Sequence, residues 1–290
     1  MGRMSEISQK KKDYKTPITE NLVSLVRGDV FEIGKHRLIF GDATNRNDIA
    51  KLMDGKLADM IFTDPPFNLA SDRIGSIASN TDFINGGGEL TTQEFTDFLT
   101  KISANLYEFS VDNSIHFICI NWKNILPMML ATKCYDKFKS LIVWNKMNGG
   151  LGGFYRSQYE LIFVFQKGKG SSIQNFSFKD YRTNIWNFNG QGVFGFDRNQ
   201  GIERVHPTIK PIKLVADAIK DCSNENDIIL DLFGGSGTTM VASHLKNRIC
   251  FMSELDEKYC NVIIRRMLLL DESLRVVCEG VDVTERFLGY

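Results

Sequence analysis

The sequence lacks the features that would place a protein in a membrane or outside the cell. It contains no run of about eighteen apolar residues, and residues 1–15 include no apolar signal region. Its six cysteines are scattered without a CxxC pair, which favours reduced thiols over a disulfide framework or a metal site. The sequence therefore predicts a cytoplasmic protein that holds no metal.

The chain also lacks an excess of charge of either sign. Its 35 Lys and Arg residues balance 35 Asp and Glu residues, whereas nucleic-acid-binding proteins usually carry a surplus of basic side chains. Any surface for nucleic acid must therefore be local. With 290 residues, of which 43% are hydrophobic, the chain can bury a large core and form one domain.

Two segments combine an apolar run with less ordinary residues. In the first, Ala58 to Thr63 leads into Asp64-Pro65-Pro66-Phe67, which places a carboxylate, rigid carbonyl groups and a flat ring at the end of a strand. A proline turn that ends a strand beside a core phenylalanine would have the same letters. The segment alone therefore leaves both interpretations open.

The second segment, Ile228 to Phe233, opens into Gly234-Gly-Ser-Gly-Thr-Thr239. A turn of small residues before a helix lets backbone amides meet an anionic ligand. The glycines match neither the dinucleotide-binding spacing nor the P-loop spacing. A plain strand, turn and helix is therefore an equally good interpretation of this segment alone.

Strands and helices are expected to alternate around these segments. Helices are predicted after Thr91, where Glu94 completes a capping box, and over Pro211–Cys222 and Tyr259–Leu270. This alternation predicts an α/β fold with a mostly parallel, doubly wound sheet, whose ligands lie at the carboxyl ends of the strands. The expected strands are Arg37–Phe40, Asp59–Thr63, Ile115–Ile120, Ser140–Trp144, Tyr159–Phe165, Ile228–Phe233 and Arg248–Glu254.

Together, the segments resemble the DNA amino-methyltransferases. The Asp64 segment is similar to their motif IV, the glycine turn to their motif I, and His206-Pro-Thr-Ile-Lys-Pro211 to the HPTxKP signature of their motif X. Motif IV comes first along the chain, which is the order of the circularly permuted beta group. The resemblance implies a circularly permuted, Rossmann-like class I methyltransferase fold. It predicts a catalytic domain over residues 21–165 and 206–290, after a flexible tail over residues 1–20.

The resemblance also assigns roles to residues. Asp64 and the Pro65 carbonyl group would accept hydrogen bonds from the two hydrogens of an exocyclic amine, and Pro66 would help to fix that geometry. Phe67 would stack on a base flipped out of the duplex. Glu254 would accept hydrogen bonds from ribose hydroxyl groups. The full set implied for the cofactor S-adenosylmethionine is Asp42, His206, Thr208, Lys210, Pro211, Asp231, Phe233, Gly234, Gly235, Ser236, Gly237, Thr238 and Glu254.

Two polar segments lie outside these motifs. Residues 68–89 predict a mobile loop, and residues 166–205 predict a target-recognition insert. The insert interleaves basic and aromatic residues, which suits phosphate contacts with base stacking, although a solvated loop with a small satellite core would look similar. These residues are Lys167, Lys169, Lys179, Arg182 and Arg198, with Phe176, Phe178, Tyr181, Trp186 and Phe188. Tyr155 to Phe163 also looks like motif VIII, where Arg156 and Tyr159 would touch the base or its phosphates unless they only end an edge strand.

The activity implied is site-specific methyl transfer to the N6 amine of adenine in double-stranded DNA, by base flipping and direct transfer. In this family an aspartate at position 64 favours adenine, whereas a serine is commoner in N4-cytosine enzymes. Three alternatives stay open: the cytosine enzyme, a DNA-binding subunit without turnover, and an enzyme that methylates amines of small molecules or proteins. The expected setting is a bacterial or phage restriction-modification system at the nucleoid, with a homodimer as the expected assembly.

Overall fold

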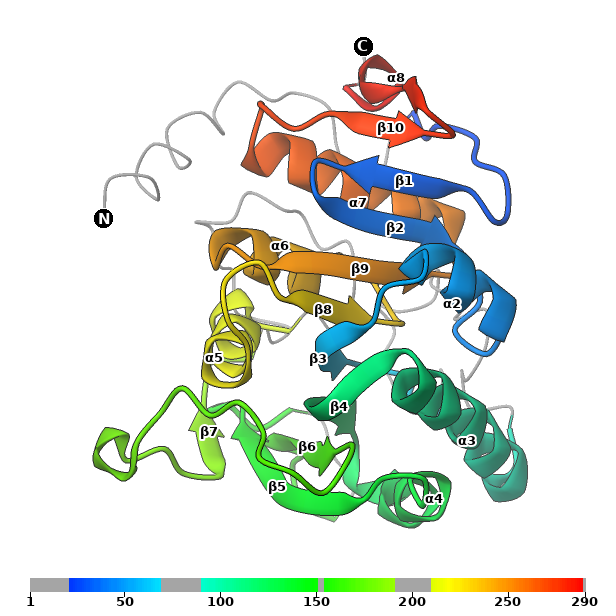
Figure 1. Cartoon of the computed structure of the whole chain (residues 1–290). Helices are drawn as coiled ribbons and strands as arrows, with labels where there is room; N and C mark the ends of the chain where they lie inside the picture. Colours follow the sequence, from blue (N-terminus) through cyan, green and yellow to red (C-terminus); the bar gives the residue numbers. More distant parts are fainter. Residues whose placement is uncertain (1–20, 69–89, 151–153, 191–209, 289–290) are drawn as a thin grey trace.

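The computed structural model describes residues 21–68, 90–150, 154–190 and 210–288, which form one large sheet flanked by helices (Figure 1). Within these ranges the sheet has eleven strands in the order β11-β10-β1-β2-β9-β8-β3-β4-β6-β5-β7. Their bounds are β1 Val30–Ile33, β2 His36–Phe40, β3 Ala58–Thr63, β4 Ser110–Ile120, β5 Lys137–Asn145, β6 Tyr159–Gln166, β7 Ile185–Asn187, β8 Ile228–Asp231, β9 Ile249–Glu254, β10 Val276–Cys278 and β11 Val281–Asp282.

Five neighbouring strands at the centre of the sheet run parallel: β2, β9, β8, β3 and β4. Their carboxyl ends therefore meet at one edge, which is where ligands bind in sheets of this kind. The flanks differ from the mostly parallel sheet that the sequence predicts. On one side β1, β10 and β11 pair antiparallel, and on the other β6 lies antiparallel between β4 and β5. The α/β class is confirmed, and the sheet is mixed.

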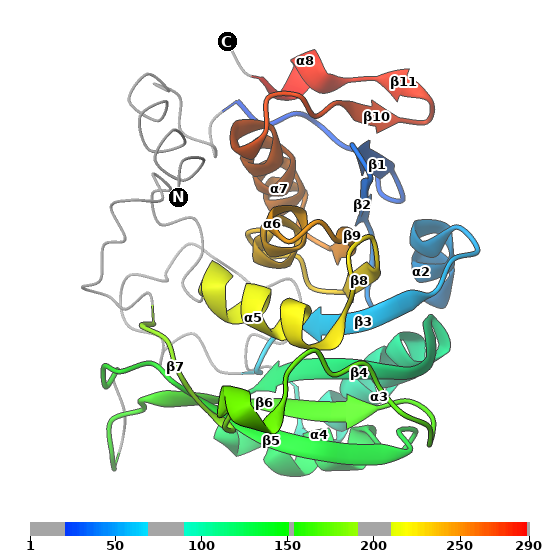
Figure 2. The ribbon, with the colours of Figure 1, turned by 60° about the vertical axis from the view of Figure 1, so that its left-hand side comes forward.

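Helices cover both faces of the sheet (Figures 1 and 2). One face packs against α2 (Arg46–Met53), α3 (Thr92–Glu108) and α4 (Ile125–Ala131). The other packs against α5 (Ile212–Cys222), α6 (Thr238–Leu245) and α7 (Glu257–Leu270), and the short α8 (Thr284–Phe287) packs beside α7. Each face of the sheet thus has its own hydrophobic core. Because side chains alternate along a strand, Phe163 of β6 packs in the core beneath α2, α3 and α4, and its neighbour Ile162 packs in the core on the opposite face.

The start of α3 follows from local sequence. The Thr91 hydroxyl group accepts a hydrogen bond from the Glu94 amide, and the Glu94 carboxylate accepts one from the Thr91 amide at 2.9 Å. The predicted capping box is therefore confirmed. Leu99 and Ile102, at the predicted spacing, are buried against the sheet.

The predicted insert is only partly irregular where the structure describes it. Gln166 ends β6, a short 3₁₀ turn covers Phe178–Asp180, and β7 pairs parallel with β5 as an edge strand of the main sheet. Residues 191–205 of the predicted insert, the predicted tail over residues 1–20 and residues 69–89 of the predicted loop lie outside the described residues.

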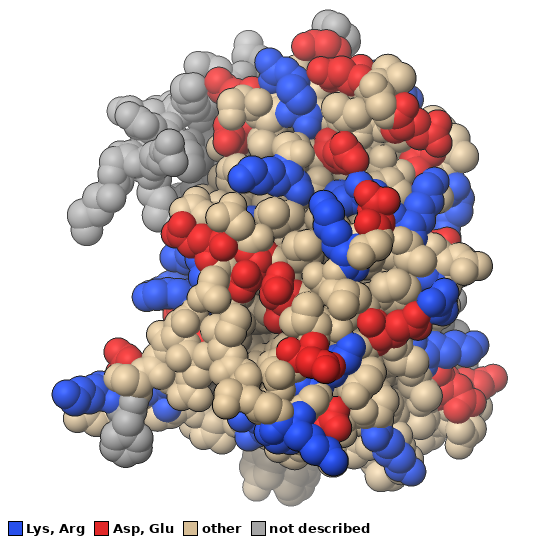
Figure 3. All heavy atoms as spheres, in the orientation of Figure 1, with Lys and Arg blue, Asp and Glu red and all other residues tan. Residues whose placement is uncertain are grey.

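The surface of the described residues agrees with the zero net charge. On the face shown in Figure 3, Lys and Arg side chains alternate with Asp and Glu side chains and form no continuous basic strip. Within the described ranges, no helix combines the length and the apolarity that a membrane crossing needs.

Candidate active site

The sheet brings the ends of four strands together. The Thr63 hydroxyl group at the end of β3 donates to Oδ1 of Asp231 at the end of β8, over 2.8 Å. Glu254 ends β9, and its carbonyl oxygen accepts from the amide of Gly41, the residue that follows β2 and precedes Asp42. The Asp64 segment, the glycine turn, Glu254 and Asp42 therefore share one edge of the sheet.

Asp64 belongs to a charged cluster with Lys210, Glu160 and Lys146. Nζ of Lys210 lies 2.5 Å from Oδ2 of Asp64 and 2.9 Å from Oε2 of Glu160. Nζ of Lys146 lies 2.5 Å from Oε1 of Glu160. Lys210 and Glu160 are buried. Burying charge is costly unless it is paired, and this cluster holds two groups of each sign.

The cluster shifts the pKa of its members. Burial raises the pKa of Asp64, and the Lys210 charge opposes this rise only in part. Burial also pushes the pKa of Glu160 up, but the charges of Lys210 and Lys146 outweigh it and hold that pKa below its ordinary value. Burial lowers the pKa of Lys210, yet the two carboxylates raise it well above its ordinary range, so Lys210 stays a cation.

Only one of the two carboxylate oxygens of Asp64 has a hydrogen-bond partner among the described residues. Oδ2 accepts from Lys210, whereas Oδ1 is buried and has no hydrogen-bond partner among the described residues. A buried acceptor without a donor is costly and rare in folded proteins. Because this oxygen lies at the edge where ligands bind, it is suited to accept a hydrogen from a bound ligand.

Phe67 combines packing with a place beside the charged cluster. Its carbonyl oxygen accepts from Nδ2 of Asn124 over 2.6 Å, and its half-buried ring packs against both cores. Nζ of Lys210 lies 5.4 Å from the centre of the ring. Pro65 is buried and Pro66 is half-buried. This position is consistent with both interpretations of Phe67, as a residue that packs in the core and as a residue that contacts a ligand at the site.

The glycine turn between β8 and α6 has one face that packs and one that is open. A Cβ atom on Gly234 would come within 2.9 Å of side chains from β9 and α7. Gly235 has a φ of +49°, and a Cβ atom there would meet no described atom within 4 Å. Gly237, with a φ of +80°, is the N-cap residue directly before α6. The turn therefore offers an open backbone surface at Gly235.

Two buried carboxylates hold this turn. Glu254 accepts from the amides of Gly235, Leu255 and Asp256 over 2.6 to 2.8 Å, and only one of these bonds goes to Oε2. Asp231 accepts from the Phe233 amide over 3.0 Å. Burial raises the pKa of both carboxyl groups to about 7 although their hydrogen bonds oppose the rise. Oε2 of Glu254 keeps room for another donor.

The other predicted cofactor residues have varied positions. Oδ1 of Asp42 accepts from the amide and the hydroxyl group of Thr44 over 2.8 Å, which leaves Oδ2 to face Arg27 at 3.9 Å. Pro211 directly precedes α5. His206 and Thr208 lie outside the described residues.

Three residues of this region escaped prediction: Glu160, Lys146 and Arg266. The Arg266 guanidinium group, buried in α7, donates to the Ser236 carbonyl over 2.7 Å and lies 3.4 Å from Oγ1 of Thr238, and burial lowers its pKa to about 10. Glu160 comes directly before the apolar run Leu161–Phe165 of β6, and Arg266, with Arg265, interrupts the apolar run of α7. A charge at a position that periodicity assigns to the core was the available signal.

The insert residues do not all present their charges to solvent. Nζ of Lys167 donates to the carbonyl oxygens of Tyr107 and Ser110 over 2.8 and 2.6 Å. Arg182 bonds Asp221 over 2.8 Å. Both side chains therefore have partners inside the protein, and phosphate contact by Lys167 and Arg182, which the composition of the insert suggests, stays a prediction that would require these side chains to leave those partners.

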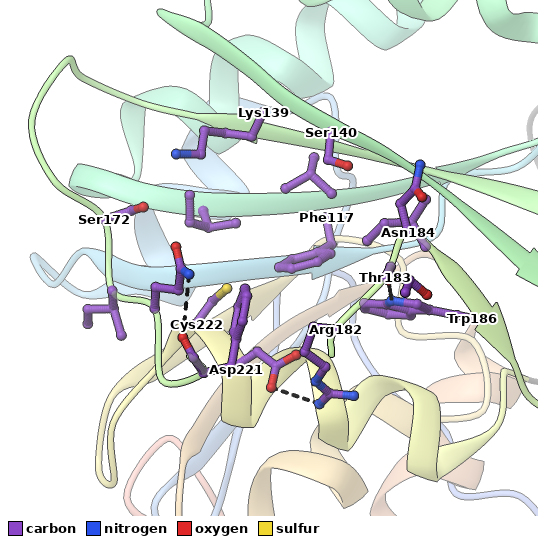
Figure 4. A pocket seen from close by; sticks show the side chains of 16 residues that line it. Phe117, Lys139, Ser140, Ser172, Arg182, Thr183, Asn184, Trp186, Asp221 and Cys222 are labelled. Carbon is purple, nitrogen blue, oxygen red and sulfur yellow. Dashed lines mark hydrogen bonds and ion pairs between the residues drawn. The ribbon is translucent and has the colours of Figure 1, made fainter. Parts of the chain in front are cut away.

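A cavity of about 260 Å³ lies between β4, β5 and β6 on one side and residues 172–186 with the end of α5 on the other (Figure 4). Phe117 and Trp186 form apolar walls, and the Arg182–Asp221 ion pair lies beside them. No residue of the charged cluster or the glycine turn lines this cavity, so it is separate from the candidate site. The described ranges hold no group of three or more potential metal ligands.

Comparisons with known proteins point in one direction. Residues 58–265 match a protein-family model described as DNA methylase. The chain is 26% identical over 257 residues to the DNA adenine methyltransferase YhdJ of Escherichia coli (strain K12), with 79% of this chain and 82% of that protein covered.

Two solved structures share the fold. TTHA0409 from Thermus thermophilus, in complex with S-adenosyl-L-methionine, matches with a TM-score of 0.58 and 18% identity over 85% of this chain and 96% of that one. The cytosine-N4-specific PvuII DNA methyltransferase matches with a TM-score of 0.57 and 14% identity over 89% of this chain and 94% of that one.

Proposed function

The chain belongs to the DNA methylase family, and from that premise we propose that it transfers a methyl group from S-adenosylmethionine to the N6 amine of adenine in double-stranded DNA. The observation that carries the proposal is Asp64. Its Oδ1, which has no hydrogen-bond partner in the part of the chain that the structure describes, lies at the sheet edge that also holds the glycine turn. The order of the motifs supports placement in the circularly permuted beta group.

The site fits this cofactor on the evidence of its own residues. When bound, S-adenosylmethionine supplies a methyl group that its sulfonium centre has already activated. The open backbone at Gly235 lets an anionic group approach the amides of the turn. Oε2 of Glu254 and Oδ2 of Asp42, at the ends of the next two strands, are acceptors suited to hydroxyl and amine donors.

Positioning is the main task of the protein in this reaction. The lone pair of an exocyclic amine is delocalised into the base, so the amine is a weak nucleophile. Oδ1 of Asp64 and the Pro65 carbonyl group would accept its two hydrogens and hold the nitrogen nearer to tetrahedral geometry. Lys210 binds Oδ2 and thereby turns Oδ1 towards the amine, while Glu160 and Lys146 hold Lys210 in place.

The base must leave the duplex to reach Asp64. We propose that Phe67 stacks on the flipped base. We also propose that the segment over residues 166–205 contributes to target recognition, and that the protein is bacterial or phage-encoded and acts at the nucleoid. The N4 amine of cytosine presents the same pair of hydrogens, and the fold shared with the PvuII enzyme supports it as the second candidate. The intact charged cluster around Asp64 argues against the third candidate, a DNA-binding subunit that has no methyltransferase activity.

Sequencing with modified-base detection tests the proposal. DNA from cells that express the chain should carry N6-methyladenine at one short sequence, and DNA from cells that express Asp64→Ala should not. N4-methylcytosine in place of methyladenine would support the second candidate. Unmodified DNA, with the purified protein folded and bound to duplex DNA, would contradict both.

A further inference from the structure

The cavity beneath residues 172–186 lies at the opposite end of α5 from the charged cluster (Figure 4). Lys210 comes just before α5, whereas Asp221 and Cys222, which line the cavity, end that helix. The volume of about 260 Å³ is slightly below the range of about 300–1,000 Å³ that is usual for small-molecule sites. The cavity therefore has room for a small molecule at a place that the proposed methyl transfer does not use.

The segment over residues 172–186 is fixed to the rest of the protein near both of its ends. The Asn175 amide donates to the Asp221 carbonyl oxygen at the end of α5 over 2.8 Å. The Asn184 side chain donates to the Leu141 carbonyl oxygen of β5 over 3.1 Å. Because the segment is held by both α5 and β5, the cavity beneath it is formed without a ligand, as is usual for small-molecule sites.

A β-bulge in β5 directs two neighbouring side chains to the cavity. Phe138 pairs with Phe165 and Ser140 pairs with Val164, so Lys139 is an extra residue that has no partner on β6. In a regular strand Lys139 and Ser140 would point to opposite faces of the sheet, yet both line the cavity. Bulges commonly redirect a side chain and are frequent beside functional sites. The bulge therefore places a cation next to a hydroxyl group in the cavity lining.

This cation has no counter-charge in the cavity. Arg182 and Asp221 form an ion pair with each other, so Lys139 is the one charged side chain of the lining without an ion-pair partner among the described residues. The hydroxyl groups of Ser140 and Ser172 also have no hydrogen-bond partner in the part of the chain that the structure describes. An ammonium group and two hydroxyl groups are suitable donors for a carboxylate.

The remaining lining is mainly apolar. Phe117, Ile142 and Val164 are buried, and the ring centroids of Phe117 and Trp186 lie 6.1 Å apart. Aromatic walls favour flat aromatic ligands, which they can contact by stacking or edge-to-face packing. The cavity therefore joins an aromatic wall to a cation that has no partner among the described residues.

We propose that the cavity is a second binding site, for a small molecule that combines a flat aromatic body with one carboxylate group. Lys139 binds the carboxylate, together with the hydroxyl groups of Ser140 and Ser172. The aromatic body packs against Phe117 and Trp186. The occupant is thus neither the methyl donor nor the target base.

Binding of 1-naphthoate to the full chain tests the proposal, with 1-naphthamide as the uncharged counterpart. Calorimetry should give a Kd for naphthoate of about 1 mM or lower, the scale expected for about thirteen non-hydrogen atoms. Lys139→Met should weaken naphthoate binding about fivefold, the size of a favourable surface ion pair, and leave naphthamide binding within about twofold. Lys101→Met is the matched control, because Lys101 is also exposed but lies on α3. It should bind both probes as the wild-type protein does.

S-adenosylmethionine should not displace naphthoate, because no residue of the glycine turn or the charged cluster lines the cavity. Displacement would place the probe in the candidate active site and overturn the proposal. An absence of saturable binding at millimolar naphthoate would also overturn it, as would equal weakening in Lys139→Met and Lys101→Met. Ser140→Leu fills the cavity and should abolish the binding of both probes. If this variant melts like the wild-type protein and still binds naphthoate, the cavity is not the site.

Discussion

Nζ of Lys210 lies 2.5 Å from Oδ2 of Asp64, although 146 residues separate them in sequence. Asp64 reaches this point from the end of β3, and Lys210 reaches it just before α5. Their contact joins the Asp64-Pro65-Pro66-Phe67 segment to the segment that resembles motif X. It also decides which oxygen of Asp64 stays open to a ligand.

Asp64→Ala should lower single-turnover methylation by at least about a hundredfold, the usual scale for a group that stabilises a transition state. Donor affinity in calorimetry should stay within a few-fold, because the lost bonds act mainly in the transition state. Asp97→Ala removes an exposed carboxylate from α3 and serves as the control. A loss of donor affinity as large as the loss of turnover would move Asp64 out of the role proposed.

Gly235→Val should reduce donor affinity more than about tenfold, since its side chain would fill the open surface of the turn. The matched control is Gly280→Val, because Gly280 also has a positive φ, +78°, and an open Cβ direction. Both variants should lose stability through the left-handed backbone, by about 1–2 kcal/mol. Equal donor affinity of the two variants in calorimetry would refute the assignment of the turn.

Phe67→Ala should slow methylation by roughly ten- to a hundredfold, because a stacked ring is worth about 1–3 kcal/mol per base. Phe67→Tyr should stay active, since the stacking face is kept. Phe67 is half-buried, so truncation should cost less than the about 3–5 kcal/mol of a fully buried phenylalanine.

Phe98→Ala gives the control for Phe67, because Phe98 is also half-buried against the same core. Fluorescence of 2-aminopurine at the target position measures base flipping, and thermal melts measure stability. If Phe67→Ala and Phe98→Ala both flip the base as well as the parent does, Phe67 only packs.

Glu160→Gln should lower the free energy of unfolding by about 3–5 kcal/mol, because it leaves Lys146 and Lys210 with one carboxylate between them. Adding Lys146→Met restores the balance of charge. The double variant should therefore lose less free energy of unfolding than the sum of the losses in the two single variants. Urea denaturation of all four proteins measures this coupling. Strictly additive losses would show that the cluster does not act as a unit.

Asp231→Asn should become more stable relative to the wild-type protein as pH rises. Burial raises the pKa of Asp231 to about 7, so between about pH 4 and pH 7 the folded protein keeps a proton that the unfolded chain releases, and stability falls as pH increases. Asparagine resembles the neutral carboxyl group and has no such dependence. The relative gain from pH 5 to pH 8 should be about 2–3 kcal/mol.

The comparison of Asp231→Asn with the wild-type protein is needed because two buried histidines titrate in the opposite sense. Burial lowers the pKa of His36 and His116 to about 3, so their contribution to stability is lost as pH falls below about 6.5 in both proteins. Urea denaturation at several pH values isolates the Asp231 contribution as a difference. A difference that does not change with pH would contradict the raised pKa.

Much of the fold could be predicted because its signals are local. The capping box at Thr91 and Glu94, the apolar spacing of α3 and α5, and the small residues after β8 act between neighbours in the chain. The extents were less accurate: β4 begins five residues before the predicted Ile115, and β8 ends two residues before Phe233. The ends of a strand depend on its partner strands, and a local sequence pattern does not identify those partners.

The sequence by itself determined the α/β class, the Asp64 segment and the glycine turn, because each is written in consecutive residues. Only the tertiary structure decided that Lys210 would bind Asp64, that Glu160 would share it, and that Arg266 would hold the turn. It also joined Ile185–Asn187 to the main sheet. Such contacts depend on which strands become neighbours and on which charges must be paired once water is excluded, and both are set by packing of the whole chain.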